Sequence, residues 1–245
     1  METRRADGFI LKSVDWSESS KILTVFTDLY GKISLMVKGA KRPNSTFRGQ
    51  LETGCIVQFV YDFKEGRDVQ IAKDASVRDL YSIALTENYS RFTSFLSCLE
   101  FTDILLEKDD PHPDIFSSLQ SITIHLSTSK HPESFMIRYI LELVDFLGFK
   151  LHLTECGVCG NPLEKQYQYS PKDGILCENC FGLSIFSDMK PLMYKCLRAI
   201  ESLSLAELDK VSINPQLLND ILFLFKEYIE HHFNMKLQLK SVGTL

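Results

Sequence analysis

Cys156-Gly157-Val158-Cys159 and Cys177-Glu178-Asn179-Cys180 are two Cys-x-x-Cys pairs with seventeen residues between them. This spacing is typical of a structural zinc site, because each turn lets two thiolates face one ion and two turns complete a tetrahedron. Four thiolates leave no coordination position open for water, so we expect the metal to fold the module rather than to catalyse. The sequence therefore predicts one structural Zn²⁺ bound by Cys156, Cys159, Cys177 and Cys180.

The residues between the pairs have the pattern of a zinc ribbon. Lys165–Ser170 and Gly174–Leu176 are predicted strands, and Pro171 to Gly174 form a turn. Two disulfides are the alternative for these cysteines, but they need an oxidising compartment. A redox pair is the second alternative, and such a pair normally occurs singly. Cys55, Cys98 and Cys196 lie among apolar neighbours, and we expect them to be buried free thiols.

Helical periodicity surrounds the ribbon on both sides. From about residue 82 the apolar residues recur at helix spacing, and proline or glycine stands at the ends of these segments. The predicted helices cover roughly residues 89–108, 113–127, 132–147, 187–203 and a last one opened by Asn214-Pro215. Ser204 and Glu207 form a predicted capping box of a short helix. The sequence thus predicts a helical domain, residues 82–245, with the ribbon inserted at residues 152–184.

The first part of the chain alternates apolar and polar residues, as strands do. The predicted strands are Gly8–Val14, Lys21–Thr27, Lys32–Val37, Cys55–Phe63 and Val69–Val77. Short connections favour antiparallel pairing, and five short strands with one longer loop indicate a small closed barrel of the OB-fold type in residues 1–81. An SH3-like barrel and a sandwich fragment are the alternatives. The predicted fold class is α+β multidomain, with an antiparallel β-barrel before the helical domain.

Charge is distributed unevenly along the chain, whose formal net charge is −5. Residues 1–82 carry a net +2 and residues 83–245 a net −7, and Leu29–Leu51 contains no acidic residue. Because salt limits the reach of each charge to about 8–10 Å, a local basic tract decides anion binding more than the mean does. We therefore predict nucleic-acid contacts from this tract. The candidate residues are Lys32, Lys38, Lys41, Arg42, Phe47 and Arg48.

Two aromatic residues near the tract have two interpretations each. Phe47 is a candidate for stacking on a nucleic-acid base, and the alternative is that it folds into the barrel. Trp16, just after the first strand, is a second candidate platform. A single aromatic residue near a strand end, however, more often lies at the edge of the core.

Composition narrows the class of protein. The chain is 44% hydrophobic and 24% charged, which is ordinary for a globular protein. No apolar run approaches the roughly 20 residues of a membrane span, and no signal-peptide core follows Met1, so we predict a cytoplasmic protein. The sequence shows no nucleophile elbow, phosphate-cradling glycine loop or paired-carboxylate motif, which makes an enzyme, including a zinc-dependent one, the less favoured interpretation.

Taken together, these motifs resemble the RecO family of bacterial recombination mediators. The residues that carry the resemblance are Tyr30-Gly31-Lys32, the loop Lys38-Gly39-Ala40-Lys41-Arg42, Phe135 to Phe149 and the two cysteine pairs. The resemblance covers essentially the whole chain in the same order. It implies that Lys38, Lys41 and Arg42 belong to the family's basic loop and that the four cysteines are its zinc ligands.

The resemblance also implies a function in DNA repair and homologous recombination. Members of this family bind single- and double-stranded DNA, anneal complementary strands and engage the tail of single-strand binding protein. With RecR they help to load RecA, and they act in the bacterial cytoplasm at the nucleoid. The alternative that the residues leave open is a protein-interaction scaffold made of an OB-fold and a zinc ribbon, whose nucleic-acid contact is incidental.

Overall fold

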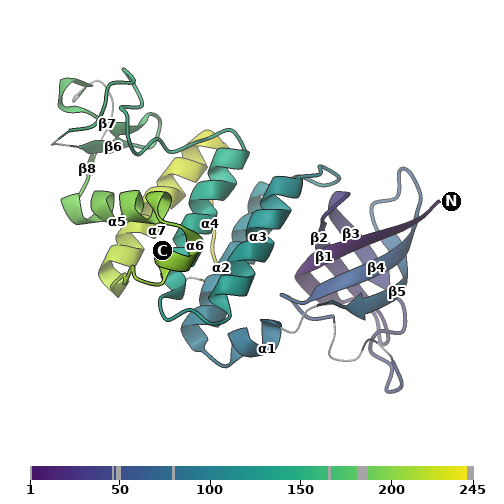
Figure 1. Cartoon of the computed structure of the whole chain (residues 1–245). Helices are drawn as coiled ribbons and strands as arrows, with labels where there is room; N and C mark the ends of the chain where they lie inside the picture. Colours follow the sequence, from purple (N-terminus) through teal and green to yellow (C-terminus); the bar gives the residue numbers. More distant parts are fainter. Residues whose placement is uncertain are drawn as a thin grey trace. The chain divides into compact units, whose positions relative to one another are not determined.

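The structure, a computed structural model, describes residues 2–45, 47, 51–78, 81–164, 167–180 and 187–241. It divides into two compact units, Met1–Thr128 and Ser129–Leu245 (Figure 1). The first unit contains a β-barrel followed by helices, and the second contains the cysteine pairs among further helices. The predicted domain boundary between residues 81 and 82 stays a prediction. The first unit contains both the barrel and the helices that follow it. No helix in the described ranges is both long and apolar enough to cross a membrane.

Five strands close into a barrel in the order β1-β2-β3-β5-β4. They are β1 (Glu2–Asp15), β2 (Lys21–Thr27), β3 (Gly31–Val37), β4 (Ile56–Phe63) and β5 (Gln70–Val77). The β3–β5 pair is parallel and the other neighbours are antiparallel. The predicted closed barrel of the OB-fold type is therefore confirmed.

Strand β1 is longer than the predicted Gly8–Val14 because it pairs with two strands. Its first half pairs with β4, and its second half pairs with β2. Gly8 lies where the two pairings meet, and a Cβ there would come within 2.4 Å of the Val25 side chain. Glycine thus lets β1 pass close to β2 at this point.

The interior of the barrel is filled by the inward faces of the strands. Strand β3 alternates buried and half-buried residues, as expected when one face meets the core. Ala40 and Leu51, which lie near the two ends of the loop between β3 and β4, join the same core. These two buried side chains anchor the described residues next to them against the barrel.

Helices α1 (Tyr81–Thr86), α2 (Tyr89–Leu105) and α3 (Pro113–Leu126) complete the first unit. Asn88 caps α2, and its side chain accepts a hydrogen bond from the Arg91 backbone N–H at 3.0 Å. Phe116 of α3 packs edge-on against Phe9 and Phe26 of the barrel, with ring centroids 5.4 and 5.6 Å away. These aromatic contacts join α3 to the outer face of β1 and β2.

Asp103 of α2 ties the helix to the barrel through two lysines. Lys12 of β1 forms an ion pair with its carboxylate, and Lys32 Nζ lies 3.6 Å from Oδ1 and also donates to the Asp103 backbone carbonyl. Beyond α2, the Asp109 N–H donates to the Lys32 carbonyl at 3.1 Å. The loop between α2 and α3 is therefore fixed against the start of β3.

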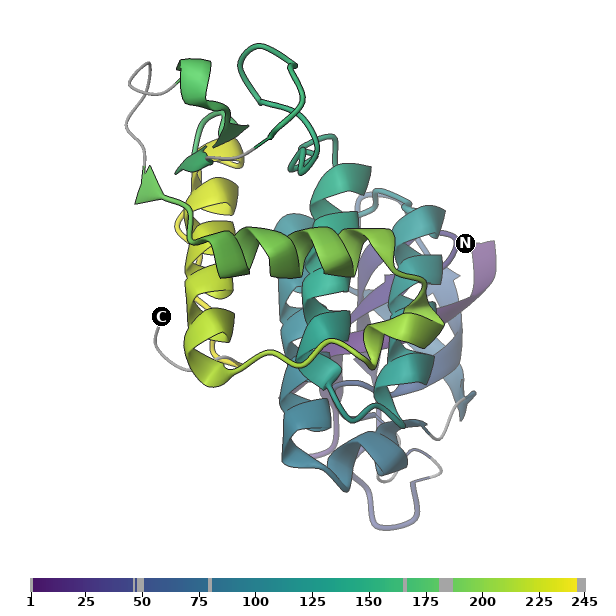
Figure 2. The same ribbon diagram turned by 60° about the vertical axis from the view of Figure 1, so that its left-hand side comes forward.

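In the second unit, a small β-sheet is inserted along the sequence between two helices. The helices are α4 (Pro132–Phe146), α5 (Pro191–Ser202), α6 (Leu205–Leu208) and α7 (Pro215–His232), and α5 lies across α4 and α7 (Figure 2). The sheet has the order β7-β6-β8, from β6 (Gln168–Ser170), β7 (Gly174–Leu176) and β8 (Ser187–Asp188). The predicted insertion of a ribbon between helices is confirmed.

Two details of the predicted elements change. The helix expected over 187–203 begins only at Pro191, and Ser187–Asp188 form β8 instead. The reason is local, because Lys190 precedes a proline and takes an extended conformation with ψ 130°. The predicted strand from residue 165 is described only from residue 167, and β6 starts at Gln168. The capping box of Ser204 and Glu207 is present as predicted.

Buried tyrosines hold the ribbon to the helices of its own unit. Tyr169 of β6 donates to the Leu224 carbonyl of α7 at 2.9 Å, and Tyr194 of α5 donates to the Leu153 carbonyl at 2.8 Å. Each hydroxyl is buried, so the hydrogen bond satisfies a donor that water does not reach. These two hydrogen bonds thus attach the ribbon to α7 and to α5.

The close approach at Gly31 yields a test of how the α2–α3 loop is held. Gly31 has φ +67°, and a Cβ there would lie 2.2 Å from the Asp110 carbonyl oxygen. We expect Gly31→Ala to lower the free energy of unfolding by about 3 kcal/mol, from backbone strain together with overlap. Urea unfolding followed by circular dichroism measures this.

Gly66→Ala is the matched control for that variant. Gly66 has a similar φ of +72°, but no atom lies within 4 Å of a Cβ there. Its loss should be about 1 kcal/mol, because only the left-handed conformation is penalised. Equal losses in the two variants would contradict the close approach of the loop.

Candidate metal centre and nucleic-acid interface

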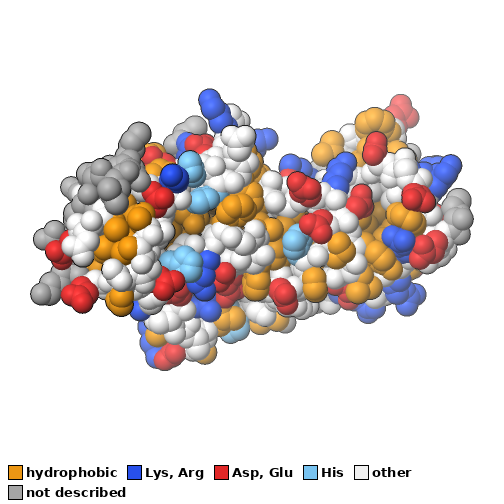
Figure 3. Space-filling view, turned by 90° about the horizontal axis from the view of Figure 1, so that it is seen from above, with side chains coloured by type: hydrophobic (Ala, Val, Ile, Leu, Met, Phe, Trp, Pro, Cys, Tyr) orange, Lys and Arg blue, Asp and Glu red, His pale blue; other side chains and the backbone are white. Residues whose placement is uncertain are grey.

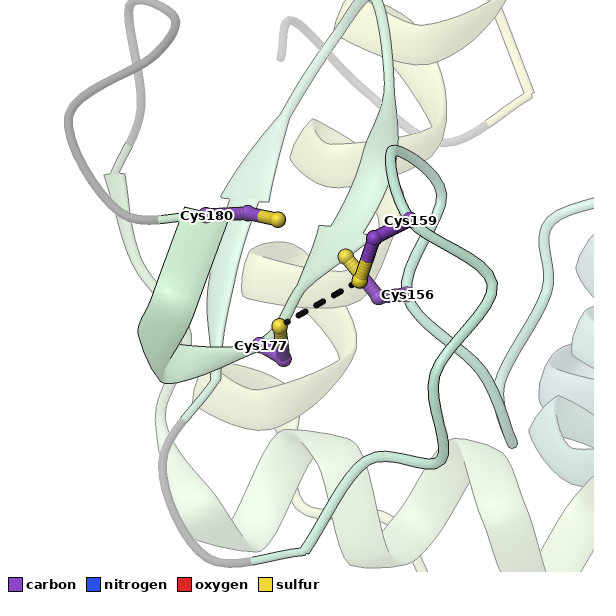
Figure 4. Close-up of side chains that lie close together, drawn as sticks. All are labelled: Cys156, Cys159, Cys177 and Cys180. Atoms are coloured by element: carbon purple, nitrogen blue, oxygen red, sulfur yellow. Dashed lines mark hydrogen bonds between the residues drawn. The ribbon is translucent and has the colours of Figure 1, made fainter.

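The four cysteine sulfurs form one cluster. All lie within 4.8 Å of one another, and Cys159 Sγ is 3.7 Å from Cys177 Sγ (Figure 4). Sulfurs that surround one zinc at about 2.3 Å lie about 3.8 Å apart along a tetrahedron edge. The cluster therefore has nearly the size that a tetrahedral metal site requires.

Backbone geometry explains how each pair reaches the cluster. The Gly160 N–H donates to the Cys156 carbonyl at 2.9 Å, and the Cys180 N–H donates to the Cys177 carbonyl at 3.0 Å, so each pair closes a tight turn. A Cβ at Gly157 would lie 1.6 Å from the Asp173 carbonyl oxygen. Only glycine lets the first turn pack against the hairpin that carries the second.

The electrostatics of the cluster favour a cation. Burial opposes ionisation of Cys156, but backbone hydrogen bonds from Cys177, Cys159 and Val158 outweigh it and lower the pKa of Cys156 to about 6. Burial and the neighbouring sulfurs raise the pKa of Cys180 to about 12. Without a cation, the ionisation of one thiol thus disfavours the ionisation of the next. A bound metal ion, in contrast, stabilises several thiolates at once. The four residues fit a resident metal ion, which they would hold as a closed structural site.

The remaining cysteines are separate from this cluster. Cys98 and Cys196 are buried, as predicted, and Cys55 is half-buried. Burial raises the pKa of all three thiols. They therefore stay protonated at neutral pH and have the properties of small apolar side chains.

The basic loop after β3 presents Lys38, Lys41 and Arg42 as exposed residues. Gly39 has φ +73°, and the Arg42 N–H donates back to its carbonyl at 3.1 Å. Lys41 Nζ lies 2.7 Å from Asp15 Oδ2, and it lowers the pKa of that exposed carboxyl. Among the ion pairs of the described residues, none involves Lys38 or Arg42.

The other predicted contact residues are placed differently. Lys32 is mostly buried against Asp103, and burial lowers the pKa of its ammonium group while Asp103 opposes that shift. The charge of Lys32 is thus paired with Asp103 inside the first unit. Phe47 packs against the barrel core, which is the second of its two interpretations. Arg48 lies outside the described residues.

Trp16 is exposed, so the expectation that it lies at the edge of the core is wrong. It retains 64% of its accessible surface, and Val14 in the same segment retains 57%. The sequence pattern did not predict this exposure, because the alternation of apolar and polar residues along β1 ends at Asp15 and Trp16 lies in the turn that follows.

The sequence pattern also missed a cavity of about 360 Å³ at the other end of β3. Arg4 lies between the rings of Tyr30 and Phe63 there, 4.7 and 3.4 Å from their centroids. Burial raises the pKa of Tyr61, which also lines the cavity, to about 12. Charges of both signs line the cavity, and three buried polar atoms belong to its lining residues Arg4, Tyr61 and Arg67.

Charges of both signs are interspersed elsewhere on the surface. On the face drawn in Figure 3, Lys and Arg side chains alternate with Asp and Glu side chains around apolar strips. A broad field of one sign does not cover that face among its described residues. The acid-free loop after β3 is therefore a local feature.

Comparisons with known proteins cover nearly the whole chain. The protein-family model described as Recombination protein O N terminal matches residues 1–81. The family model described as Recombination protein O C terminal matches residues 86–241. The protein of Alkaliphilus metalliredigens named DNA repair protein RecO is 26% identical over 234 residues, which are 94% of each chain.

Two further relatives carry the same name. The protein of Chloroherpeton thalassium is 26% identical over 244 residues, 94% of this chain and 93% of its own length. The protein of Prosthecochloris aestuarii is 30% identical over 157 residues, 64% of this chain and 59% of its own. The similarity thus includes both the barrel and the helical part with its cysteines.

The sulfur cluster generates a test by substitution. We expect the purified chain to contain one metal ion, and Cys177→Ala to lose it and to unfold the ribbon, because metal binding and folding are coupled in such sites. Metal content and thermal unfolding of the chain measure this. Cys196→Ala, which removes a buried thiol outside the cluster, should keep the metal. Retention of both metal and thermal stability by Cys177→Ala would contradict the site.

Proposed function

This chain belongs to the RecO family of DNA repair proteins, and we propose that it is a mediator of homologous recombination. In this proposal it binds single- and double-stranded DNA and anneals complementary strands. It also helps to load RecA onto strands covered by single-strand binding protein, acting together with RecR and with the tail of single-strand binding protein. The exposed basic loop on an OB-type barrel is the observation that carries the DNA-binding part.

The loop supports phosphate binding by its charge and its anchoring. Lys38 and Arg42 project from a segment whose first residues are held by buried Ala40 and by the Lys41–Asp15 ion pair. A cation held near a strand displaces condensed counterions, which drives binding without regard to sequence. We assign Lys38 and Arg42 to phosphate contact and Lys41 to both contact and positioning. Arg48 remains a proposed contact, whereas Lys32 and Phe47 are assigned to the fold.

Annealing follows from the same interaction. Two complementary strands repel each other through their phosphates, and a protein that neutralises part of this charge lowers that repulsion while it raises the local strand concentration. The bases themselves supply the pairing energy. The proposed role therefore needs charge neutralisation and proximity, and it makes and breaks no covalent bond.

We assign Zn²⁺ as the metal of the cysteine cluster. Four thiolates at tetrahedral spacing suit this ion, which has no redox chemistry of its own in proteins. The assigned role is structural, since the ribbon has short strands and a small apolar centre formed by Leu163, Leu176 and three of the four cysteines, Cys156, Cys177 and Cys180. The proposed location is the bacterial cytoplasm, where the nucleoid is.

The acidic composition of residues 83–245 favours a second role for that part of the chain. A net charge of −7 repels DNA and suits protein partners instead. A protein-interaction scaffold is therefore the second candidate function. Salt dependence distinguishes the two, because DNA binding follows a steep log–log dependence and an apolar protein contact a shallow one.

Charge removal from the loop tests the proposal. We expect Lys38→Gln with Arg42→Gln to weaken the binding of a labelled single strand and to reduce its log–log salt slope by about 1.4, since each phosphate contact on a single strand contributes about 0.7. Fluorescence anisotropy at several salt concentrations measures both quantities.

Arg5→Gln with Lys64→Gln is the matched control. These residues are exposed cations near the start of β1 and the end of β4, where Glu2 pairs with Phe63, so the change in net charge is equal. The control should keep the wild-type slope. An equal reduction in both double variants would argue against a specific role of the loop.

A further inference from the structure

Trp16 places a large aromatic side chain in water at the end of the first strand. It is the single tryptophan of the chain, and it is 64% exposed. Val14 beside it is 57% exposed, so the segment shows an apolar surface rather than one isolated side chain. Exposed aromatic faces of this kind are typical of binding surfaces.

The turn that carries Trp16 is well ordered. The Trp16 N–H donates to the Ser20 carbonyl at 3.0 Å, and the Ser20 N–H donates to Ser17 Oγ at 3.2 Å. These bonds fix the backbone on both sides of the indole. Because the backbone at Trp16 is already fixed, only its side-chain torsions lose freedom when a ligand stacks on the indole.

The basic loop is attached directly to this turn. The Lys41 N–H donates to the Ser19 carbonyl at 3.0 Å, and Lys41 Nζ forms its ion pair with Asp15, the neighbour of Trp16 in sequence. The indole and the cations of the loop therefore lie at the same end of the barrel. A strand whose phosphates bound Lys38 and Arg42 would therefore have its bases at the end of the barrel that also carries Trp16.

We propose that Trp16 is a stacking platform for unpaired bases and that it makes the chain bind single strands more tightly than duplexes. The proposal rests on the proposed function of the loop and adds the group that distinguishes the two forms of DNA. Phosphates are present in both forms, so the cations bind both. Only an unpaired base has a free face for the indole, because the faces of paired bases are covered by their neighbours.

The fluorescence of the wild-type chain tests this directly, since Trp16 is the single source of tryptophan emission. Titration with an oligothymidylate should quench the emission, with the same midpoint as the anisotropy of a labelled copy. Titration with a blunt-ended duplex of two fully paired strands should change the anisotropy and leave the emission nearly unchanged.

Substitution gives the second test. We expect Trp16→Ala to weaken oligothymidylate binding by about 5- to 150-fold, which corresponds to the loss of one base–aromatic stack. Duplex affinity and the salt slope should be unchanged, because no phosphate contact is removed. Trp16→Phe should retain most of the affinity. Val14→Ala, which removes exposed apolar surface without an aromatic face, is the matched control and should bind as the wild type does.

The outcomes separate this proposal from the function on which it rests. If DNA binding depends steeply on salt, but neither quenches the tryptophan emission nor responds to Trp16→Ala, the stacking platform is overturned. The proposed role of the basic loop in DNA binding would then still stand. An equal loss for single strands and duplexes would overturn the assigned preference. Absence of DNA binding by the wild-type chain would overturn both proposals. If Trp16→Ala proves unstable, the wild-type titrations and Trp16→Phe still decide.

Discussion

The double pairing of β1 is the constraint on which the first unit depends. One half of this strand bonds to β4 and the other to β2, and this arrangement helps to close five short strands into a barrel. Closure leaves no unpaired edge for another chain to extend. It also fixes the ends of the strands, from which the basic loop and the turn with Trp16 project. The candidate interface therefore inherits its geometry from hydrogen bonds inside the barrel.

Much of this architecture is readable from sequence because its signals are local. Each cysteine pair closes its own turn, and alternation identifies most of the barrel strands. The first half of β1 is missed because Arg4 and Arg5 interrupt the apolar pattern while their backbone still pairs with β4. Helix α5 starts later than predicted because Lys190 precedes a proline and takes an extended conformation, which an apolar periodicity does not reveal.

The role of a charged residue is harder to predict, as Lys32 and Lys38 illustrate. Both stand in the same acid-free tract, six residues apart. Lys32 meets Asp103, which follows it by seventy-one residues and reaches it only through the packing of α2. Lys38 stands in a loop and stays exposed. No local pattern distinguishes them, because the partner of a cation is set by tertiary structure.

The contiguity of the first unit has a consequence for biosynthesis. Residues 1–128 contain the five strands of the barrel together with α1, α2 and α3, so this unit can complete its internal contacts while the rest of the chain is still on the ribosome. The second unit differs, because α4 precedes the ribbon and its partners α5 and α6 follow it. Its assembly must therefore wait until the C-terminal helices have been translated, and the barrel can fold before the cysteine cluster is complete.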